Sequence, residues 1–264
     1  MNYEDILYDK TDGIATITIN RPKQLNAFRG QTIDELLEAF KDAWADRTIG
    51  VVIFTGAGER AFCVGGDLST RSEAGYSGKP SRSDLGFEID ELHSVIRDIP
   101  KPVIAAVNGY AIGGGNVLHV LCDLTIAAET AKFGQAGPKV GSVDPGFGTM
   151  YLARVVGEKK AREMWYLCEQ YTAAEAKEMG LVNRVVPAER LMEEARAWAR
   201  RILSMSPTAI KLAKVSFNAD TEHMRGTDSI ALRALALYYG TEEALEGKQA
   251  FVEKRPPDFG KFRR

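Results

Sequence analysis

One acidic side chain stands in a segment built otherwise for backbone turns. The segment FGQAGPKVGSVDPGFG, residues 133–148, is rich in glycine and proline, and Asp144 is its only carboxylate. A carboxylate on such a rigid segment can carry a proton in general acid–base catalysis. The alternative role is structural, because Asp followed by Pro145 makes a good N-cap with proline at the first helical position. The local sequence favours the cap, but a capped helix end is also a rigid mount for a reactive carboxylate.

Two glycine turns follow short apolar stretches, AFCVGGDL at 61–68 and GYAIGGGNVL at 109–118. Glycine lets the main chain approach a ligand closely. The second turn also opens a helix, whose first N–H groups lack helical partners and favour negative charge. Two such amides aimed at one oxygen would form an oxyanion hole. Tight turns needed only for close packing explain the same glycines equally well.

Several other kinds of chemistry lack their motifs. The sequence contains no G-x-S-x-G, no H-E-x-x-H and no phosphate loop, and GYAIGGGN does not fit the dinucleotide pattern G-x-G-x-x-G. The histidines His93, His119 and His223 are isolated, so we expect helix-surface or core positions and no metal site. The cysteines are widely spaced, which favours neither a disulfide framework nor a zinc site.

Composition indicates an ordinary globular protein. The chain of 264 residues is 45% hydrophobic, and 34 Lys+Arg against 36 Asp+Glu give a net charge of −2. This balance predicts no nucleic-acid partner, because there is no excess of cations to replace counterions. The longest apolar stretch, 102–128, is interrupted by polar residues, so we expect a buried core and no membrane span. Unpaired cysteines and an N-terminus without a signal-peptide pattern predict a soluble cytoplasmic protein.

The elements that would position these residues alternate along the first two thirds of the chain. Strands are expected at 13–20, 50–58, 102–109 and 124–129, with helices at 32–46, 87–100 and 113–123 between them. Thr32 and Glu35 resemble a capping box. This order predicts an α/β fold with mainly parallel pairing. After about Pro187 only helical patterns follow, at 188–206, 207–218 and 228–254, so we expect a core at 1–187 and a helical region at 188–264. The polar stretch 71–86 is expected to form a mobile surface loop that closes over ligands.

The sequences AFCVGGD and NGYAIGGGNVLHVLCDLTIAAETAKFGQ resemble the crotonase superfamily, whose members stabilise a thioester enolate of an acyl-CoA. The resemblance extends from INRPKQLNAF to EKRPPDF. It implies a spiral of repeated ββα units, followed by helices that join a homotrimer or a hexamer made of two trimers. It also implies that the amides of Gly66 and Gly114 bind the thioester oxygen.

Relatives of this family supply further expected roles. Asp144 is expected at the active site, with Ser142 helping to hold the acyl carbonyls. Tyr76 and Tyr239 match tyrosines that approach the acyl group. Arg29 and Lys254 match cations near the CoA phosphates. The other positions implied in substrate or CoA binding are Val64, Gly65, Asp67, Leu68, Tyr110, Gly113 and Ala136.

The reaction is not settled by the superfamily. Enoyl-CoA hydratases carry two glutamates at places that are Val117 and Gly137 here, so a simple hydratase is not expected. The segment around Asp144 is similar to that of 2-ketocyclohexanecarboxyl-CoA hydrolases and of naphthoate synthases. The sequence FRG, Asn116 and SVDPG favour the hydrolase, which opens a ring. GPKVG, WYLC and LVNRVVP are at least as similar to the synthase, which closes one.

Two further expectations remain from the resemblance. Naphthoate synthases with QTGPK hold a bicarbonate beside the glutamine and glycine, and Gln135 and Gly137 keep that arrangement while Ala136 replaces threonine. No other cofactor is implied besides the CoA of the substrate. A non-catalytic member that binds acyl-CoA or RNA is the remaining alternative, and the balanced charge disfavours RNA.

Overall fold

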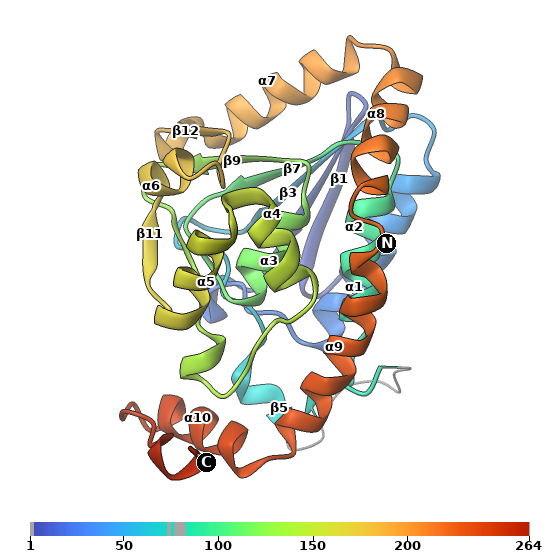
Figure 1. Cartoon of the computed structure of the whole chain (residues 1–264). Helices are drawn as coiled ribbons and strands as arrows, with labels where there is room; N and C mark the ends of the chain where they lie inside the picture. The colour runs from blue at the N-terminus through green and yellow to red at the C-terminus, as the bar shows by residue number, and fades with distance from the viewer. Residues whose placement is uncertain (1–2, 73–74, 77–82, 264) are drawn as a thin grey trace.

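A computed structural model describes residues 3–72, 75–76 and 83–263, and two sheets form its centre (Figure 1). The larger sheet has the order β1-β2-β3-β7-β9-β12. From β2 onward its strands are parallel, and β1 pairs antiparallel at the edge. Its strands are β1 (Ile6–Thr11), β2 (Ile14–Ile19), β3 (Val51–Gly56), β7 (Val103–Val107), β9 (Leu124–Ala128) and β12 (Arg184–Val186).

The smaller sheet has the order β11-β10-β8-β4, in which β4, β8 and β10 are parallel. Its strands are β4 (Ala61–Cys63), β8 (Tyr110–Ile112), β10 (Lys132–Gly134) and β11 (Gln170–Thr172). Each of β3, β7 and β9 in the large sheet is followed along the chain by β4, β8 or β10 in the small one. The chain therefore winds as a spiral of ββα turns, which confirms the predicted fold class.

Helices cover both sides of this spiral. They are α1 (Gly30–Ala45), α2 (Ile89–Asp98), α3 (Gly114–Leu121), α4 (Leu152–Val156), α5 (Glu158–Leu167), α6 (Ala173–Glu178), α7 (Leu191–Leu203), α8 (Pro207–Ala219), α9 (Met224–Tyr239) and α10 (Glu242–Val252). A short hairpin, β5 (Arg71–Ser72) and β6 (Gly75–Tyr76), follows β4. Helix α7 packs its buried face on β3, β7 and β9, while α9 runs beside α2 (Figure 1).

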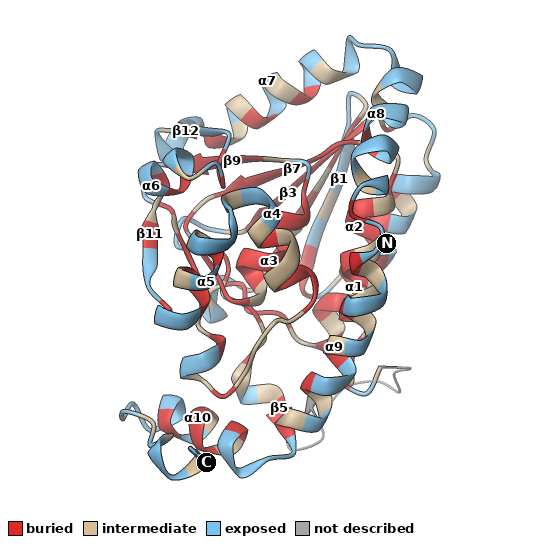
Figure 2. Ribbon diagram, viewed as in Figure 1, coloured by how far each residue is buried: buried red, intermediate tan, exposed pale blue. Residues whose placement is uncertain are grey.

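Burial follows from this layering. The residues of β3 and β7 are buried throughout, as expected for parallel strands covered on both faces. In Figure 2 the large sheet and α3 are mostly buried, whereas α8 and α9 show much exposed surface. No strand follows Val186 as far as Arg263, where the description ends, so the helical C-terminal region is confirmed. The boundary between two units at residue 187 stays a prediction.

Some local predictions were wrong. Helix α1 begins at Gly30, two residues before the predicted start, and Thr32 pairs with Arg29 at its N-terminus. Glu35 is therefore free to accept hydrogen bonds from the main-chain N–H groups of Glu4 and Asp5, at 2.8 and 2.7 Å. The predicted single helix at 228–254 is two helices, α9 and α10, which are separated at Gly240.

The stretch 71–86 is not simply a surface loop. Arg71 and Tyr76 are buried, with 3% and 5% of their surface exposed. Residues 73–74 and 77–82, which the prediction also included, lie outside the described residues. None of the helices in the described part of the chain is long and apolar enough to cross a membrane.

Candidate active site

Three segments meet at one edge of the small sheet. Strands β4, β8 and β10 are parallel neighbours, so their carboxyl ends lie together. The residues that follow these strands are 64–66, 113–114 and 135–137. Ligands of α/β proteins commonly bind at the carboxyl ends of parallel strands. The fold thus gathers both glycine turns and the start of the Asp144 segment at a common edge.

The two glycine turns are in direct contact. A Cβ added to Gly65 would lie 3.0 Å from the main-chain nitrogen of Gly114. Gly65 and Gly113 have φ values of +87° and +58°, which residues with a side chain rarely adopt. Both glycines are therefore required by backbone conformation, and Gly65 also by the close approach of the two turns.

The amides of Gly66 and Gly114 are left unpaired by this arrangement. Phe28 brackets Gly66, since its N–H donates to the Gly65 carbonyl at 2.9 Å and its carbonyl accepts from the Asp67 N–H at 2.8 Å. Gly114 is the first residue of α3, where the helix offers its N–H no partner. Neither amide donates a hydrogen bond to any described residue. Two neighbouring free N–H groups are the geometry of an oxyanion hole.

Asp67 supports the first turn and is fully engaged. Its carboxylate accepts hydrogen bonds from Arg21 at 3.0 Å and from the Ser69 hydroxyl at 2.6 Å. Burial raises the pKa of Asp67, but these hydrogen bonds outweigh burial and hold the pKa below its usual value. Asp67 is therefore an ionised anchor of the turn.

Asp144 is not the helix cap that the local sequence favours. The helix begins as a π-helical turn at Phe147–Tyr151, and Gly146 precedes it. The Phe147 N–H is bound instead by the carboxylate of Asp228 from α9, at 2.9 Å. The prediction was wrong because the capping carboxylate comes from 84 residues further along the chain, where no local pattern could indicate it.

The carboxylate of Asp144 is consequently available. It is partly buried and forms no hydrogen bond with any described residue. Burial raises its pKa from 3.8 to about 6; the charge of His93 acts against this rise and that of Asp228 adds to it. A carboxyl group with a pKa near neutrality can both accept and return a proton.

Asp144 lies beside the position of a hydratase glutamate. A Cβ added to Gly148 would lie 2.8 Å from the Cβ of Asp144 and 3.1 Å from Cγ2 of Val117. The second glutamate position, Gly137, has no room for a side chain, because its Cβ would lie 2.6 Å from the main-chain oxygen of Ser142. Asp144 therefore places a carboxylate close to Val117 from a neighbouring segment.

Tyr239, Tyr76 and Ser142 form a cluster of hydroxyl groups. The hydroxyls of Ser142 and Tyr239 are 2.7 Å apart, and the rings of Tyr76 and Tyr239 meet edge-on at 6.2 Å. Burial raises the pKa of both tyrosines above 10, and the charge of Asp144 raises both further. Both phenols are therefore protonated at neutral pH and can donate. The Tyr76 hydroxyl lies over the first turn, 2.1 Å from where a Cβ of Gly66 would be.

Arg71 is a residue that sequence reasoning missed. Its guanidinium lies 4.6 Å from the centre of the Tyr239 ring and donates to the main-chain oxygens of Val140, Gly141 and Ala244 at 3.2–3.3 Å. It thereby ties the Asp144 segment to the start of α10. A buried arginine directed at carbonyls carries no sequence signal, since an arginine in a polar stretch is usually solvated.

Gln135 presents unused polar atoms to the interior. Its side chain is 1% exposed, and neither the amide nitrogen nor the amide oxygen has a hydrogen-bond partner among the described residues. Buried polar groups without partners are costly, and a polar group bound here would find both a donor and an acceptor in Gln135. Ala136 and Gly137 adjoin it along the chain.

The structure is less informative about the residues predicted to bind CoA. Arg29 is bound to Asp5 through Nε and Nη2, at 2.8 and 2.9 Å, and to Glu4 at 2.6 Å. Lys254 is exposed just after α10. Tyr110 is 38% exposed. The residues Val64 and Leu68 are half-buried around the first turn. Their contacts with CoA stay predictions.

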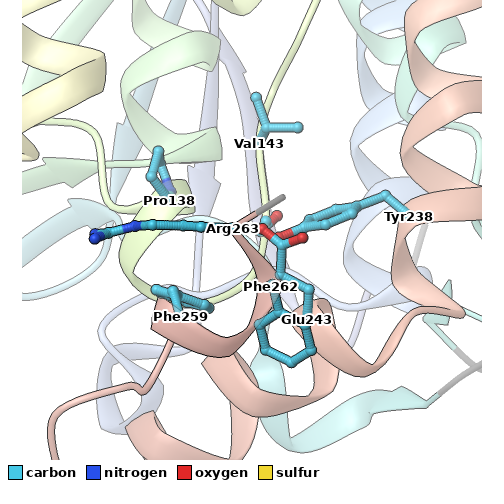
Figure 3. Close-up of a pocket in the computed structure, with 8 residues that line it drawn as sticks. Pro138, Val143, Tyr238, Glu243, Phe259, Phe262 and Arg263 are labelled. Atoms are coloured by element: carbon cyan, nitrogen blue, oxygen red, sulfur yellow. The ribbon is translucent and has the colours of Figure 1, made fainter.

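A pocket of about 430 Å³ opens next to this centre (Figure 3). It lies between the Asp144 segment, the end of α9 and the C-terminal segment, and Ser142 reaches its wall. The lining residues are Pro138, Ser142, Val143, Tyr238, Glu243, Phe259, Phe262 and Arg263. Gly66, Gly114 and Asp144 do not line the pocket, and the Tyr76 hydroxyl lies over Gly66. The pocket therefore adjoins the glycine turns and is not formed by them.

Comparison with known proteins decides the family. The model of the enoyl-CoA hydratase/isomerase family matches residues 9–262. The chain therefore belongs to the enoyl-CoA hydratase/isomerase family. This is the crotonase superfamily, whose members act on acyl-CoA, so the resemblance of the two glycine turns is confirmed at that level.

Solved structures of this family cover nearly the whole chain. An enoyl-CoA hydratase from Mycobacterium avium subsp. paratuberculosis is 30% identical, with a TM-score of 0.86 over 98% of this chain and 99% of that one. An enoyl-CoA hydratase from Bacillus anthracis is 36% identical, with a TM-score of 0.75 over 96% and 98%. A carnitinyl-CoA hydratase from Mycobacterium avium is 32% identical, with a TM-score of 0.85 over 98% and 99%.

Proposed function

We propose that this protein opens a ring by hydrolysis, converting 2-oxocyclohexane-1-carbonyl-CoA to pimeloyl-CoA. The observation that carries the proposal is the carboxylate of Asp144, which is free of hydrogen-bond partners among the described residues, lies beside Val117 and has its pKa raised to about 6 by burial. A 3-oxoacyl thioester needs a base near the ring ketone and an oxyanion hole for the thioester enolate.

The residues can divide this reaction among them. The thioester oxygen binds the N–H groups of Gly66 and Gly114. Asp144 removes a proton from water, which attacks the ring ketone. The adduct then collapses: the bond between the ketone carbon and the α-carbon breaks, a carboxylic acid forms, and the electron pair becomes the thioester enolate.

The last proton comes from a phenol. Tyr239 or Tyr76 protonates the α-carbon, and both are protonated at neutral pH because burial raises their pKa values. The hydrogen bond between Ser142 and Tyr239 orients the phenol and links it to the Asp144 segment. The phenol then regains its proton from Asp144, so that atoms and charge balance over the cycle.

Hydration of a simple enoyl-CoA is the reaction named for the similar structures. That chemistry needs a proton carrier where this chain has Val117 or Gly137. Neither residue carries a proton, and Gly137 has no space for a longer side chain. At about a third of identical residues, these similarities support acyl-CoA chemistry without assigning the reaction.

Ring closure of o-succinylbenzoyl-CoA to 1,4-dihydroxy-2-naphthoyl-CoA is the second candidate. The buried, unpartnered amide of Gln135 favours it, because a bicarbonate held there beside Gly137 would serve as an additional base. In this reaction the same glycine amides stabilise the enolate. Asp144 and the tyrosines then align the chain and move protons during cyclisation.

A homotrimer or a hexamer of two trimers is part of the proposal. The C-terminal helices α8, α9 and α10 expose large apolar side chains, which are costly to leave in water and indicate a covered face. The most exposed are Leu212, Phe217, Ile230, Leu237 and Val252. Light scattering on the purified chain tests this: a monomer would contradict it.

Mass spectrometry of paired reactions tests the function. Purified protein receives 2-oxocyclohexane-1-carbonyl-CoA in one sample and o-succinylbenzoyl-CoA in the other, each with and without bicarbonate. Gain of one water in the first sample alone establishes the ring-opening hydrolase. Loss of water in the second alone establishes the synthase, and a rate that depends on bicarbonate supports a bound anion in the reaction. Acyl-CoA binding without turnover of these or any other β-ketoacyl-CoA would favour a non-catalytic member of the family.

A further inference from the structure

The π-helical turn that follows Asp144 is held by two helices from distant parts of the chain. It packs against α9, and its first residue, Phe147, contacts side chains of α2. The polar or charged side chains in these contacts belong to three buried residues: His93 and Arg97 of α2, and Asp228 of α9. π-Helical turns are rare and often mark functional sites.

Asp228 makes the hydrogen bond on which the turn depends. It is 3% exposed, and its Oδ1 accepts from the Phe147 N–H at 2.9 Å. Gly146 has φ +74°, and a Cβ there would lie 2.4 Å from the same Oδ1. The glycine is thus required both by its conformation and by the presence of Asp228. Asp144 stands two residues before this junction, so its position depends on the carboxylate of Asp228.

Side chains of α2 contact both the π-helical turn and Asp228. The His93 Nδ1 lies 3.8 Å from the other carboxylate oxygen of Asp228, and its ring meets Phe147 edge-on at 6.4 Å. The Arg97 guanidinium lies 4.7 Å from the ring centres of both Phe147 and Tyr151. Phe147 therefore contacts cationic or titratable groups of α2 through its ring and Asp228 through its main chain.

The charges around Asp144 act in opposite directions. His93 lowers the pKa of Asp144 and Asp228 raises it, both acting on the larger effect of burial. The other titratable groups that its charge influences are Cys63, Tyr76 and Tyr239, whose pKa values are raised first by burial, so they are uncharged near neutrality. Arg97 of α2 packs its guanidinium on the rings of Phe147 and Tyr151. Asp228 of α9 and His93 of α2 are therefore the two charged groups that shift the pKa of Asp144.

We infer that Asp228 is a positioning residue, which, paired with His93, holds the Gly146–Phe147 junction and thereby sets the place and the charge environment of Asp144. The inference rests on the proposed role of Asp144 as the proton carrier. It assigns to α9 a task in catalysis besides supplying Tyr239.

Three variants of the full-length protein separate the two parts of this role. Asp228→Asn keeps an oxygen that can accept from Phe147 and removes the charge. Asp228→Ala removes both. Asp220→Asn is the matched control, since Asp220 lies on the surface at the end of α8, where its carboxylate pairs with Arg154.

Hydrogen exchange read by mass spectrometry tests the positioning without any substrate. Asp228→Ala should exchange faster in the peptide that spans 144–151, whereas Asp228→Asn and Asp220→Asn should match the unmodified protein. Unchanged exchange in Asp228→Ala would overturn the inference. This measurement decides the positioning role even if the proposed function fails.

The pH dependence of kcat/KM on whichever substrate turns over tests the tuning. Asp228→Asn should move the acidic limb to lower pH and His93→Gln to higher pH, because they remove opposite effects on Asp144. Asp228→Ala should lower kcat about 10- to 100-fold with little change in KM, as expected for a displaced catalytic group. Equal losses in Asp228→Asn and Asp228→Ala with no shift of the limb would reduce Asp228 to a packing role and overturn the inference.

If Asp144→Asn keeps full turnover, the proposed function fails while the exchange result stands. A titration of the Asp144 carboxyl carbon by NMR in ¹³C-aspartate-labelled protein then replaces kinetics. Asp228→Asn should still lower that pKa, and an unchanged pKa would overturn the tuning.

Discussion

The two glycine turns and the segment that carries Asp144 meet at one site but are built differently. At Gly66 and Gly114 the proposed chemistry belongs to the main chain, and the fold needs only short strands and glycines to expose it. At Asp144 the chemistry belongs to a side chain, and distant residues hold it: Arg71 and Asp228 bind its segment. Donors made of backbone are set by local conformation, whereas the acid depends on tertiary contacts. The main-chain donors should therefore tolerate substitutions around them, whereas the position of Asp144 should be lost when distant contacts are removed.

The largest expected effect comes from the acid itself. Asp144→Asn should lower kcat/KM about 10²- to 10⁴-fold, the usual contribution of a general acid–base group. The variant should be no less stable than the unmodified protein, because Asp144 caps no helix and has no hydrogen bond to lose among the described residues. Steady-state kinetics and calorimetry on the same preparation check both. Equal losses of activity and stability would return Asp144 to a structural role.

The second-largest loss of activity should follow from adding a methyl group at the first glycine turn. Gly66→Ala would place a Cβ 2.1 Å from the Tyr76 hydroxyl oxygen, which displaces the phenol and crowds the donor. Turnover should fall about 10²- to 10³-fold, as when an oxyanion donor is lost. Gly226→Ala is the control, because nothing lies within 4 Å of its added Cβ and it stands within α9. A Gly66→Ala enzyme as fast as this control would contradict the oxyanion hole.

Removal of Arg71 tests the dependence of the acid segment on remote contacts. Arg71→Met leaves the main-chain oxygens of Val140, Gly141 and Ala244 without their buried donor. The free energy of unfolding should fall by about 2 kcal/mol. Arg47→Met, at an exposed arginine, should be neutral in the same denaturant titration. An Arg71→Met protein of unchanged stability would show that the segment carrying Asp144 keeps its conformation without Arg71.

The pH dependence of stability at Asp144 is the last test of the comparison. Its folded pKa of about 6 lies above the unfolded value of 3.8, chiefly through burial, so the folded state binds the proton more tightly. The unmodified protein should therefore lose stability relative to Asp144→Asn as pH rises from about 4 to 6, and stay lower above that range. Unfolding titrations of both proteins at several pH values measure the difference. A parallel pair of curves would contradict the raised pKa.

The difference between local and tertiary positioning also explains which features could be predicted from the sequence. The β-branched runs at 51–56 and 103–107 and the glycines after the small-sheet strands indicate their structure locally, so the fold and the two donors can be predicted from them. The strands β4, β8 and β10 have only three residues each and carry too little periodicity to be recognised. The sequence assigns the cap at Phe147 to Asp144 because Asp228 is adjacent only in the folded chain. The placement of Arg71 in a surface loop is wrong for the same reason.

The spiral delivers successive loops to one edge of the small sheet, and each loop arrives on its own turn of the chain. The proposed donors come from the loops after β4 and β8, whereas the proposed acid comes from the loop after β10. A change in the third loop can therefore move or replace the acid while the anion-binding amides stay in place. Such a scaffold allows one binding mode to be inherited and the reaction to be exchanged, which suits the diversification of a family by small local substitutions.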